Sequence, residues 1–351
     1  NPGSTSTKIA IYENGKELYR KNLTHSAETI AQYPKIVDQV PFRKAEVEKF
    51  LDEIAYDMTK LTAIACRGGS LTPIHMGAEV NDEMIDVLIY RPSGQHASSL
   101  AAMIGYEMAK NLGIKAYIYD GNTADEMDDL PRISGCPLVD KLSMGHFLNT
   151  KAVGRMYAES IGKKYEELNL IMVHTGGGIS IGLHKNGVIV DVCTDEDGTM
   201  SPERSGGLPS IGMAKLCFSG KYTFDEVSAM VRGKGGLTAY LGTNDVREVE
   251  KRIADGDEYA ELVYNAMIYK LAKCIGGLAT AVDGEIDGIV VTGGIAHSKM
   301  FIEKLEKRVK FIHPLAVIPG EYEMEALAAG ITRVLNGEET ARIYKEDEKL
   351  R

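Results

Sequence analysis

The chain opens with Asn1-Pro2-Gly3-Ser4-Thr5-Ser6-Thr7-Lys8, and this glycine- and hydroxyl-rich loop leads into the apolar residues 9–12 and the turn Glu13-Asn14-Gly15-Lys16. The same order of parts returns as His174-Thr175-Gly176-Gly177-Gly178, the apolar residues 179–183 and the turn Lys185-Asn186-Gly187. An Asn-Gly pair between two apolar stretches is the strongest short-range signal of a β-hairpin. Both stretches therefore predict the same unit, which is a loop followed by a strand, a tight turn and a second strand.

The repetition of this unit predicts an internal duplication. Asn14 and Asn186, which start the two turns, are 172 residues apart, about half of the 351-residue chain. The apolar residues 170–173 predict a strand directly before the second loop, so a corresponding strand is expected before the first loop. Two unrelated glycine-rich hairpins are the alternative, but the shared order of parts favours duplication.

Strand and helix patterns alternate along the rest of the chain. The predicted strands are 61–65, 115–119 and 289–291, and the predicted helices are 98–112, 258–278 and 299–309. A final helix is expected where one stripe carries Met324, Leu327, Ala328, Ile331 and Val334, and Gly337 ends it. The alternation predicts an α/β fold, and the charged tail after Gly337 is expected to be a solvated surface.

Composition excludes several classes of protein. Hydrophobic residues make up 44% and charged residues 26% of the chain, which is typical of a folded domain rather than of a disordered or collagen-like chain. No apolar run approaches the ~18–20 residues of a membrane span. The net charge is −10 without a basic block, so neither nucleic acid nor a membrane is an expected partner. The five cysteines form no Cys-x-x-Cys pair, which favours a reducing, cytoplasmic location over a disulfide framework or a zinc site.

The glycine-rich loops are candidate phosphate sites, because glycine lets several backbone N–H groups approach an anion closely. Neither loop matches the P-loop or the Rossmann fingerprint, and a single loop of this kind is more often a structural turn. Two related loops, one in each half, favour a pair of elements around a polyphosphate. A third glycine element, Val290-Val291-Thr292-Gly293-Gly294-Ile295-Ala296-His297, predicts a strand-to-helix junction. Such a junction suits a phosphate or a ribose, and close packing of a helix on a strand is the alternative.

These three motifs resemble those of the acetokinase family, which belongs to the actin, sugar kinase and heat-shock chaperone superfamily. The resemblance rests on the opening loop, on 174–178 and on Thr292-Gly293-Gly294-Ile295-Ala296, and it spans the chain in the correct order. The motif Asn-Pro-Gly-Ser-Thr-Ser-Thr and the length of the chain resemble those of the family's butyrate kinases more than those of its acetate kinases.

The resemblance implies an α/β fold of two duplicated actin/ribonuclease H-like domains with an interdomain cleft. Residues 1–121 with 326–351 would form an N-terminal acetokinase-type domain with a returning C-terminal helix, and 122–325 a nucleotide-binding domain. The implied reaction is the ATP- and Mg²⁺-dependent phosphorylation of butyrate, or of a similar short-chain or branched fatty acid, to an acyl phosphate, with ATP formed from ADP in reverse. The implied partners are a small carboxylic acid and the nucleotide, in a homo-oligomer. The alternatives are an acetate or propionate kinase and a non-catalytic nucleotide-binding regulator.

The resemblance also implies catalytic residues, whose chemistry suits phosphoryl transfer. Arg67 and Arg204 resemble the family's arginines, and a guanidinium fork suits both a carboxylate acceptor and a moving phosphoryl group. His146 resembles a histidine that donates to the γ-phosphoryl group, and His96 lies near the implied acceptor region. An isolated arginine is more often a surface charge and an isolated histidine a structural one. Asp120 resembles the family's aspartate, for which an electrostatic or metal role is expected because the acceptor carboxylate is already ionised.

The implied metal and nucleotide residues complete the candidate site. Asp120 and Glu325 resemble the Mg²⁺-linked carboxylates, although a glutamate at a helix start also complements the helix dipole. Asp195-Glu196-Asp197-Gly198 lacks the full calcium-loop pattern and is interpreted as a loop. The residues implied to bind ATP or ADP are Asn1, Ser4, Ser6, Lys8, His174, Thr175, Gly176, Gly177, Gly178, Asn244, Asp245, Arg247, Gly293, Gly294 and Ile295.

Overall fold

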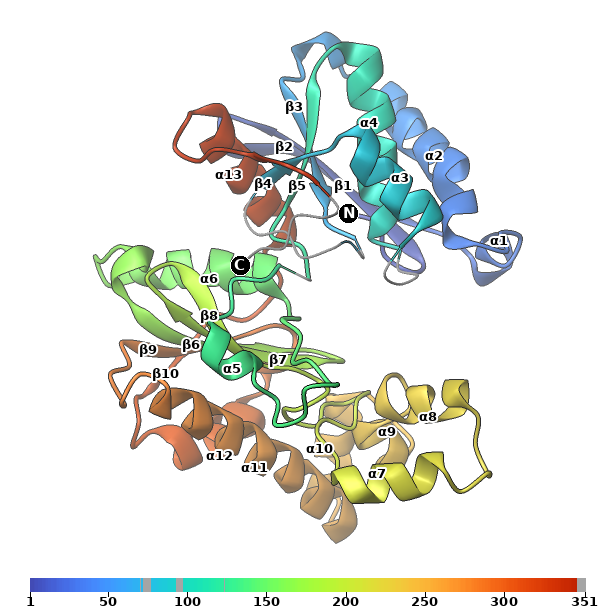
Figure 1. The fold of residues 1–351 in the computed structure, drawn as a ribbon. Helices are drawn as coiled ribbons and strands as arrows, with labels where there is room; N and C mark the ends of the chain where they lie inside the picture. The colour runs from blue at the N-terminus through green and yellow to red at the C-terminus, as the bar shows by residue number, and fades with distance from the viewer. Residues whose placement is uncertain (70, 72–76, 93–96, 123, 346–351) are drawn as a thin grey trace. The chain divides into compact units, whose positions relative to one another are not determined.

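The computed structural model describes residues 1–69, 71, 77–92, 97–122 and 124–345. The chain forms two compact units, which we call unit 1 (Asn1–Asp125 with Tyr322–Arg351) and unit 2 (Glu126–Glu321). Both contain strands and helices (Figure 1). The family resemblance implies domain boundaries at 121/122 and 325/326, whereas the two compact units divide at 125/126 and 321/322.

Unit 1 combines a hairpin with a four-stranded sheet. The hairpin consists of β1 (Ser6–Glu13) and β2 (Lys16–Thr24), as the Asn14-Gly15 turn predicts. The sheet has the order β11-β4-β5-β3, in which β3 and β5 are parallel and β4 is antiparallel to β5. Its strands are β3 (Ala63–Arg67), β4 (Gly77–Glu79), β5 (Lys115–Tyr119) and β11 (Arg342–Ile343). The helical segments of unit 1 are α1 (Ala27–Ile30), η1 (Ile36–Gln39), α2 (Val40–Glu53), η2 (Met58–Lys60), α3 (Asp82–Tyr90), α4 (Ser99–Leu112) and α13 (Glu323–Leu335).

Unit 2 is built around one five-stranded sheet of order β10-β9-β6-β7-β8. Its strands are β6 (Asn169–Thr175), β7 (Ile179–Lys185), β8 (Val188–Cys193), β9 (Gly288–Thr292) and β10 (Leu315–Val317). The longer helices are α6 (Phe147–Ser160), α11 (Glu258–Thr280) and α12 (Lys299–Val309). The shorter ones are α5 (Asp129–Arg132), η3 (Tyr165–Glu167), α7 (Ser210–Cys217), α8 (Phe224–Val231), α9 (Gly236–Leu241), α10 (Val246–Ala254) and η4 (Ile295–His297).

The sheet of unit 2 is covered on both faces, and this explains the continuous apolar sequence of β6. Neighbouring residues of a strand point to opposite faces. Ile171 and Val173 join the core formed with α11 and α12. On the other face, Leu170 packs toward α6. Its side chain and that of Tyr165 both lie next to Gly154 of this helix. Figure 1 shows α6 on one side of the sheet and α11 and α12 on the other.

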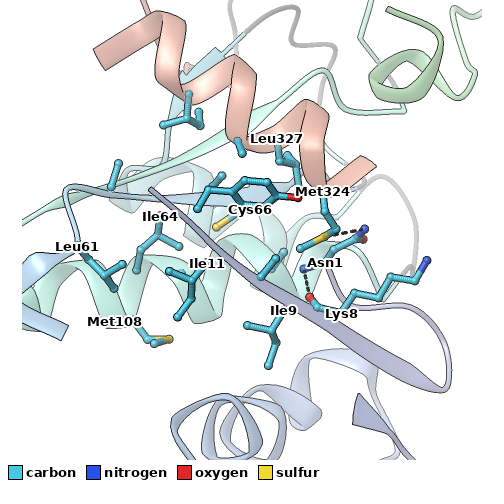
Figure 2. A pocket seen from close by; sticks show the side chains of 18 of the residues that line it. Asn1, Lys8, Ile9, Ile11, Leu61, Ile64, Cys66, Met108, Met324 and Leu327 are labelled. Carbon is cyan, nitrogen blue, oxygen red and sulfur yellow. Dashed lines mark hydrogen bonds between the residues drawn. The ribbon is translucent and has the colours of Figure 1, made fainter. Parts of the chain in front are cut away.

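A cavity of about 360 Å³ lies in unit 1 between β1 and β3, and residues of α4 and α13 also line it (Figure 2). Its lining is mostly apolar and includes Ile9 and Ile11 of β1, Ile64 of β3 and Leu327 of α13. In unit 2 the corresponding place, between the hairpin strand β7 and the parallel strand β9, is filled by β6. The cavity therefore lies at the place that β6 occupies in unit 2, and we interpret it as a gap between strands rather than as a substrate site.

Most of the predicted elements are present, but the prediction for the tail is wrong. The strand 115–119 and the helix 299–309 have the predicted bounds, and the helices predicted at 98–112 and 258–278 shift by one or two residues. After Gly337, however, β11 pairs in parallel with β4, and Tyr344 is only 3% exposed. A short charged sequence gives no local signal of this long-range strand pairing. No helix within the described parts of the chain is long and apolar enough to cross a membrane.

His184 introduces a titratable group into the core of unit 2. The side chain is fully buried, and its Nδ1 lies 2.7 Å from the Tyr165 hydroxyl, while Nε2 has no partner in the described structure. Burial, assisted by the charge of Lys151, lowers the pKa of His184 from 6.5 to about 3. Between pH 6.5 and about 3, His184 therefore binds a proton in the unfolded chain but not in the folded protein.

We expect His184 to make the protein less stable as the pH falls from 6.5 toward 3. In this window the unfolded chain binds more protons than the native state, so the free energy of unfolding decreases by up to about 1.4 kcal/mol per pH unit. Urea unfolding at several pH values measures this slope, and His184→Gln, which keeps a hydrogen-bond acceptor, should flatten it. The exposed His297 offers a control, because His297→Gln should leave the slope unchanged. Equal slopes for the parent and His184→Gln would contradict the prediction.

Candidate functional site

The opening loop of unit 1 folds back on itself. Gly3 N donates to Ser6 O at 2.7 Å, and Lys8 N donates to Asn1 O at 3.1 Å. Pro2 and Thr7 form an isolated antiparallel bridge, which closes the loop. The four candidate residues Asn1, Ser4, Ser6 and Lys8 therefore belong to one compact turn ahead of β1.

Arg67 and Asp120 are brought together by the pairing of two parallel strands. Arg67 ends β3 opposite Tyr119 of β5, and Asp120 follows directly. The next residues, Gly68 and Gly121, are so close that a Cβ on Gly68 would lie 2.8 Å from Gly121 Cα. Only glycine fits this approach at position 68, and glycine is required at position 69 because a Cβ there would lie 2.5 Å from Ser99 Cα.

Asp120 is held in an unusual conformation. Its φ is 39°, in the left-handed region that residues other than glycine rarely adopt, and its side chain is only 4% exposed. Strained backbone conformations of this kind cluster at functional sites, where the surrounding structure maintains them. Position, burial and strain together support Asp120 as a functional residue.

The structure adds Glu323, which the sequence analysis missed. Its carboxylate forms an ion pair with Arg67 and accepts a hydrogen bond from Asn1 Nδ2 at 2.8 Å. Burial would raise the pKa of the Glu323 carboxyl, but the Arg67 charge and the hydrogen bonds from Asn1 and Arg67 lower it overall. Arg67 nevertheless keeps a buried Nε without a partner among the described residues. This N–H is a donor directed at an acceptor that the described chain does not supply.

Glu325, the predicted metal residue, lies on a different side of α13 from Glu323. Residues two apart on a helix point to nearly opposite sides, because each residue turns the helix by about 100°. Glu325 pairs with Arg20 of β2, and its Oε2 is buried without a hydrogen-bond partner in the described structure. The sequence analysis named only Glu325 at the start of this helix, whereas the structure pairs Glu323 with Arg67.

The carboxylates present suit Mg²⁺ in part. The described residues contain no group of three or more His, Cys, Asp or Glu side chains arranged to hold a metal. Mg²⁺ is usually bound through one or two carboxylates together with substrate phosphates and water. Asp120 and Glu325 are carboxylates of the kind that this mode of binding uses, but they have different neighbours: Asp120 follows β5 beside Arg67, whereas Glu325 pairs with Arg20 of β2. His96, the remaining predicted substrate residue, lies outside the described residues.

In unit 2, two histidines that the sequence analysis named as candidate site residues are in contact. The rings of His146, which precedes α6, and His174, in β6, are stacked with centroids 3.8 Å apart and planes 11° apart. His146 Nδ1 lies 2.9 Å from Ser180 Oγ, and His174 Nδ1 lies 3.1 Å from Asn149 Nδ2. Each ring is thus fixed through Nδ1, which sets its orientation.

Arg204 packs directly on the second glycine loop. A Cβ on Gly178 would lie 2.5 Å from Arg204 Cζ, so Gly178 provides the space for the guanidinium. The loop is held in place by hydrogen bonds to Gly177 O from Ser201 Oγ at 2.8 Å and from Glu203 N at 3.0 Å. The structure therefore unites the loop 176–178 and Arg204, which the sequence identifies separately.

Asp195 orients Arg204, and the sequence analysis assigned it only to a loop. Its carboxylate is 3% exposed, lies 3.4 Å from Arg204 Nη1 and accepts a hydrogen bond from Arg232 Nη2 at 3.0 Å. Burial lowers the pKa of Arg232, but its hydrogen bonds and the charges of Asp195 and Glu196 raise it overall. Arg232 is 28 residues from Arg204 in sequence, and no motif signals their shared partner.

The third glycine element packs against the second loop. Gly293 has a φ of 90°, and a Cβ there would lie 2.3 Å from Thr175 O. Thr175 Oγ1 donates to Thr292 O at 2.7 Å, which ties the ends of β6 and β9 together. Gly294 then caps η4, which begins at Ile295. The segments 174–178 and 293–295, predicted to bind the nucleotide, thus lie next to each other at the ends of the neighbouring parallel strands β6 and β9.

The segment 244–247 divides into two parts. Asn244 Nδ2 donates to Glu203 Oε1, and Glu203 lies beside Gly177. Asp245 caps α10, accepting hydrogen bonds from Arg247 N and Nε at 2.9 Å each, and these bonds lower the pKa of Asp245 to about 2. The Arg247 side chain is 90% exposed. Asn244 is therefore next to the glycine loop, whereas Asp245 and Arg247 satisfy each other at a helix start.

Comparison with known proteins places this site in context. The Acetokinase family model matches residues 145–319. Butyrate kinase 2 of Clostridium acetobutylicum is 46% identical over 348 residues, which are 98% of each chain. A probable butyrate kinase of Clostridium botulinum (strain Alaska E43 / Type E3) is 47% identical over 347 residues, again 98% of each chain.

Solved structures show the same fold. The acetate kinase of Porphyromonas gingivalis has a TM-score of 0.75 at 20% identity, covering 95% of this chain and 98% of its own. A propionate kinase from Francisella tularensis has a TM-score of 0.73 at 19% identity, covering 93% and 96%. The predicted α/β fold of the acetokinase type is confirmed.

Proposed function

Because this chain belongs to the acetokinase family, it is a phosphotransferase with a carboxyl group as acceptor, and we propose that this acceptor is butyrate or a similar short-chain or branched fatty acid. The observation that carries the choice of butyrate is the identity of 46–47% over 98% of the chain to butyrate kinases. Kinases of this family use ATP and ADP, typically with Mg²⁺. The nucleotide-binding role belongs to unit 2 in this proposal, and a homo-oligomeric, cytoplasmic enzyme remains a prediction.

In the proposed reaction the acceptor carboxylate attacks the γ-phosphorus of ATP in line. A bond forms between a carboxylate oxygen and the phosphorus, the bond to the bridging oxygen of ADP breaks, and no proton has to be removed because the acid is already ionised. The glycine loop 176–178 and residues 293–295 hold the phosphates through backbone N–H groups. Reversal of the same step transfers the phosphoryl group from the acyl phosphate to ADP.

Ionisable side chains would bind the acceptor, stabilise the transition state and hold the metal ion. Arg67 holds the acceptor carboxylate, and its buried, unpartnered Nε supports this role. Arg204 and His146 stabilise negative charge that spreads over the phosphoryl oxygens during transfer. Asp120 and Glu325 would hold Mg²⁺ through water, and the bound ion would neutralise charge on the phosphate oxygens.

The expected product is an acyl hydroxamate when the enzyme works in the presence of hydroxylamine, which traps acyl phosphates. With ATP and Mg²⁺, acids of four carbons should give a kcat/KM at least about tenfold above that of acetate, since each extra methylene buried in an apolar pocket is worth about 1 kcal/mol. Assays over linear acids of two to six carbons and isobutyrate measure this preference, with reactions lacking acid as the blank.

Three other outcomes would change the proposal in different ways. A maximum at acetate or propionate would replace the acceptor while keeping the reaction. Nucleotide binding without hydroxamate from any acid would favour a non-catalytic nucleotide-binding regulator. The absence of both nucleotide binding and product would contradict the kinase function itself.

A further inference from the structure

The opening loop of unit 1 is built around a buried arginine. Arg43, in the first turn of α2, is 0% exposed. Its Nη1 donates to Gly3 O at 2.8 Å and to Ser6 O at 2.7 Å, and its Nη2 donates to Ser4 O at 2.9 Å. Nη1 also reaches Thr7 Oγ1 at 3.2 Å, and Nε donates to Gln39 Oε1 at 3.0 Å. All three nitrogens of the guanidinium thus have partners.

All these partners are uncharged oxygens. Among the described residues, no carboxylate forms an ion pair with Arg43, and burial lowers its pKa. Burying a guanidinium without a counter-ion costs free energy, and a buried charge is often replaceable by apolar residues without loss of stability. Core packing alone therefore does not explain an arginine at this position.

The three backbone contacts define which way the loop faces. In a trans peptide the N–H points away from the C=O of the same peptide group, and the described chain contains no cis peptide bond. Because Arg43 holds the carbonyls of Gly3 and Ser4, the N–H groups of Ser4 and Thr5 point to the opposite side. No described residue accepts a hydrogen bond from either of these two N–H groups.

We propose that Arg43 is a positioning residue that turns the N–H groups of Ser4 and Thr5 toward a phosphate group of the nucleotide. Adjacent N–H groups aimed to one side form a concave anion site. The uncompensated positive charge of Arg43, directly behind the same peptide groups, increases the attraction for an anion. Thr7, held by Arg43 and by His25 Nε2 at 2.9 Å, anchors the end of the loop to β1. This inference rests on the proposed function, since it assigns the opening loop to a nucleotide phosphate.

Arg43→Met tests the proposal by removing the charge and the donors while keeping an unbranched, apolar side chain. The binding of adenylyl imidodiphosphate, a non-hydrolysable ATP analogue, should weaken at least tenfold by calorimetry. The KM for butyrate should stay within about threefold of the parent. Arg43→Lys keeps the charge but reaches fewer carbonyls, so its nucleotide affinity should lie between those of the parent and Arg43→Met.

Lys44→Met is the matched control, because it removes one positive charge from the next position of the same helix. Lys44 pairs with Glu107 rather than with the loop, and its removal should leave nucleotide binding unchanged. Parent-like nucleotide affinity in folded Arg43→Met, or a change in butyrate KM alone, would overturn the proposal. If Arg43→Met does not fold, parent-like affinity in Arg43→Lys overturns it. A parent protein that binds no nucleotide would instead overturn the proposed function, which separates the two failures.

Discussion

Arg204→Ala should lower kcat by about 10³-fold or more, equivalent to about 4 kcal/mol, while the KM values for butyrate and ATP change much less. An arginine that meets charge only as the phosphoryl group moves stabilises the transition state more than the ground state, and such a loss appears in kcat. The structure supports this role because Gly178 leaves space for the guanidinium on the glycine loop and Asp195 holds it there.

Steady-state kinetics of acyl phosphate formation and of ATP formation measures this loss of kcat. Two further variants test whether it is specific to Arg204. Arg204→Lys keeps the charge but loses the planar fork, so it should recover only part of the rate. Arg232→Ala removes the other arginine on Asp195 without touching the glycine loop, and its effect on kcat should be far smaller. A parent-like kcat for Arg204→Ala with a raised butyrate KM would assign the acceptor role to Arg204 instead.

Arg67→Ala should raise the KM for butyrate by about 10- to 100-fold, with a smaller change in kcat. A charge-assisted hydrogen bond contributes about 1.5–3 kcal/mol, and it is present already when the carboxylate binds. The buried Nε of Arg67, which has no partner in the described chain, is the donor that an acceptor carboxylate would use.

The readout for Arg67 is the dependence of rate on butyrate at saturating ATP. Lys21→Ala is a control in the same unit, because Lys21 pairs with Glu53 at the surface and should not affect either constant. A kcat loss of 10³-fold in Arg67→Ala, with an unchanged butyrate KM, would exchange the roles of the two arginines. Unchanged constants in both Arg67→Ala and Arg204→Ala would contradict the carboxylate-kinase mechanism.

Local sequence determined a large part of this molecule. Asn14-Gly15 and Asn186-Gly187 produce the two hairpins because Asn and Gly adopt the positive φ that tight turns need, and all four residues have it here. The helix Lys299–Val309 has the predicted bounds, because Ser298 caps its start and apolar residues recur at helical spacing. Gly68, Gly178 and Gly293, which lie within the motifs that the sequence analysis singled out, stand where another chain segment leaves no space for a Cβ.

Tertiary structure decided which charged residues act together. Glu323 and Glu325 are two positions apart at the start of one helix, yet only Glu323 reaches Arg67, because α13 presents the two side chains to different neighbours. Asp195 joins Arg204 to Arg232, and Arg43 holds the carbonyls of Gly3, Ser4 and Ser6 from about 40 residues away. Periodicity and turn chemistry are local properties that a sequence carries in itself, whereas the partner of a buried charge depends on which distant segments the fold brings within hydrogen-bond distance.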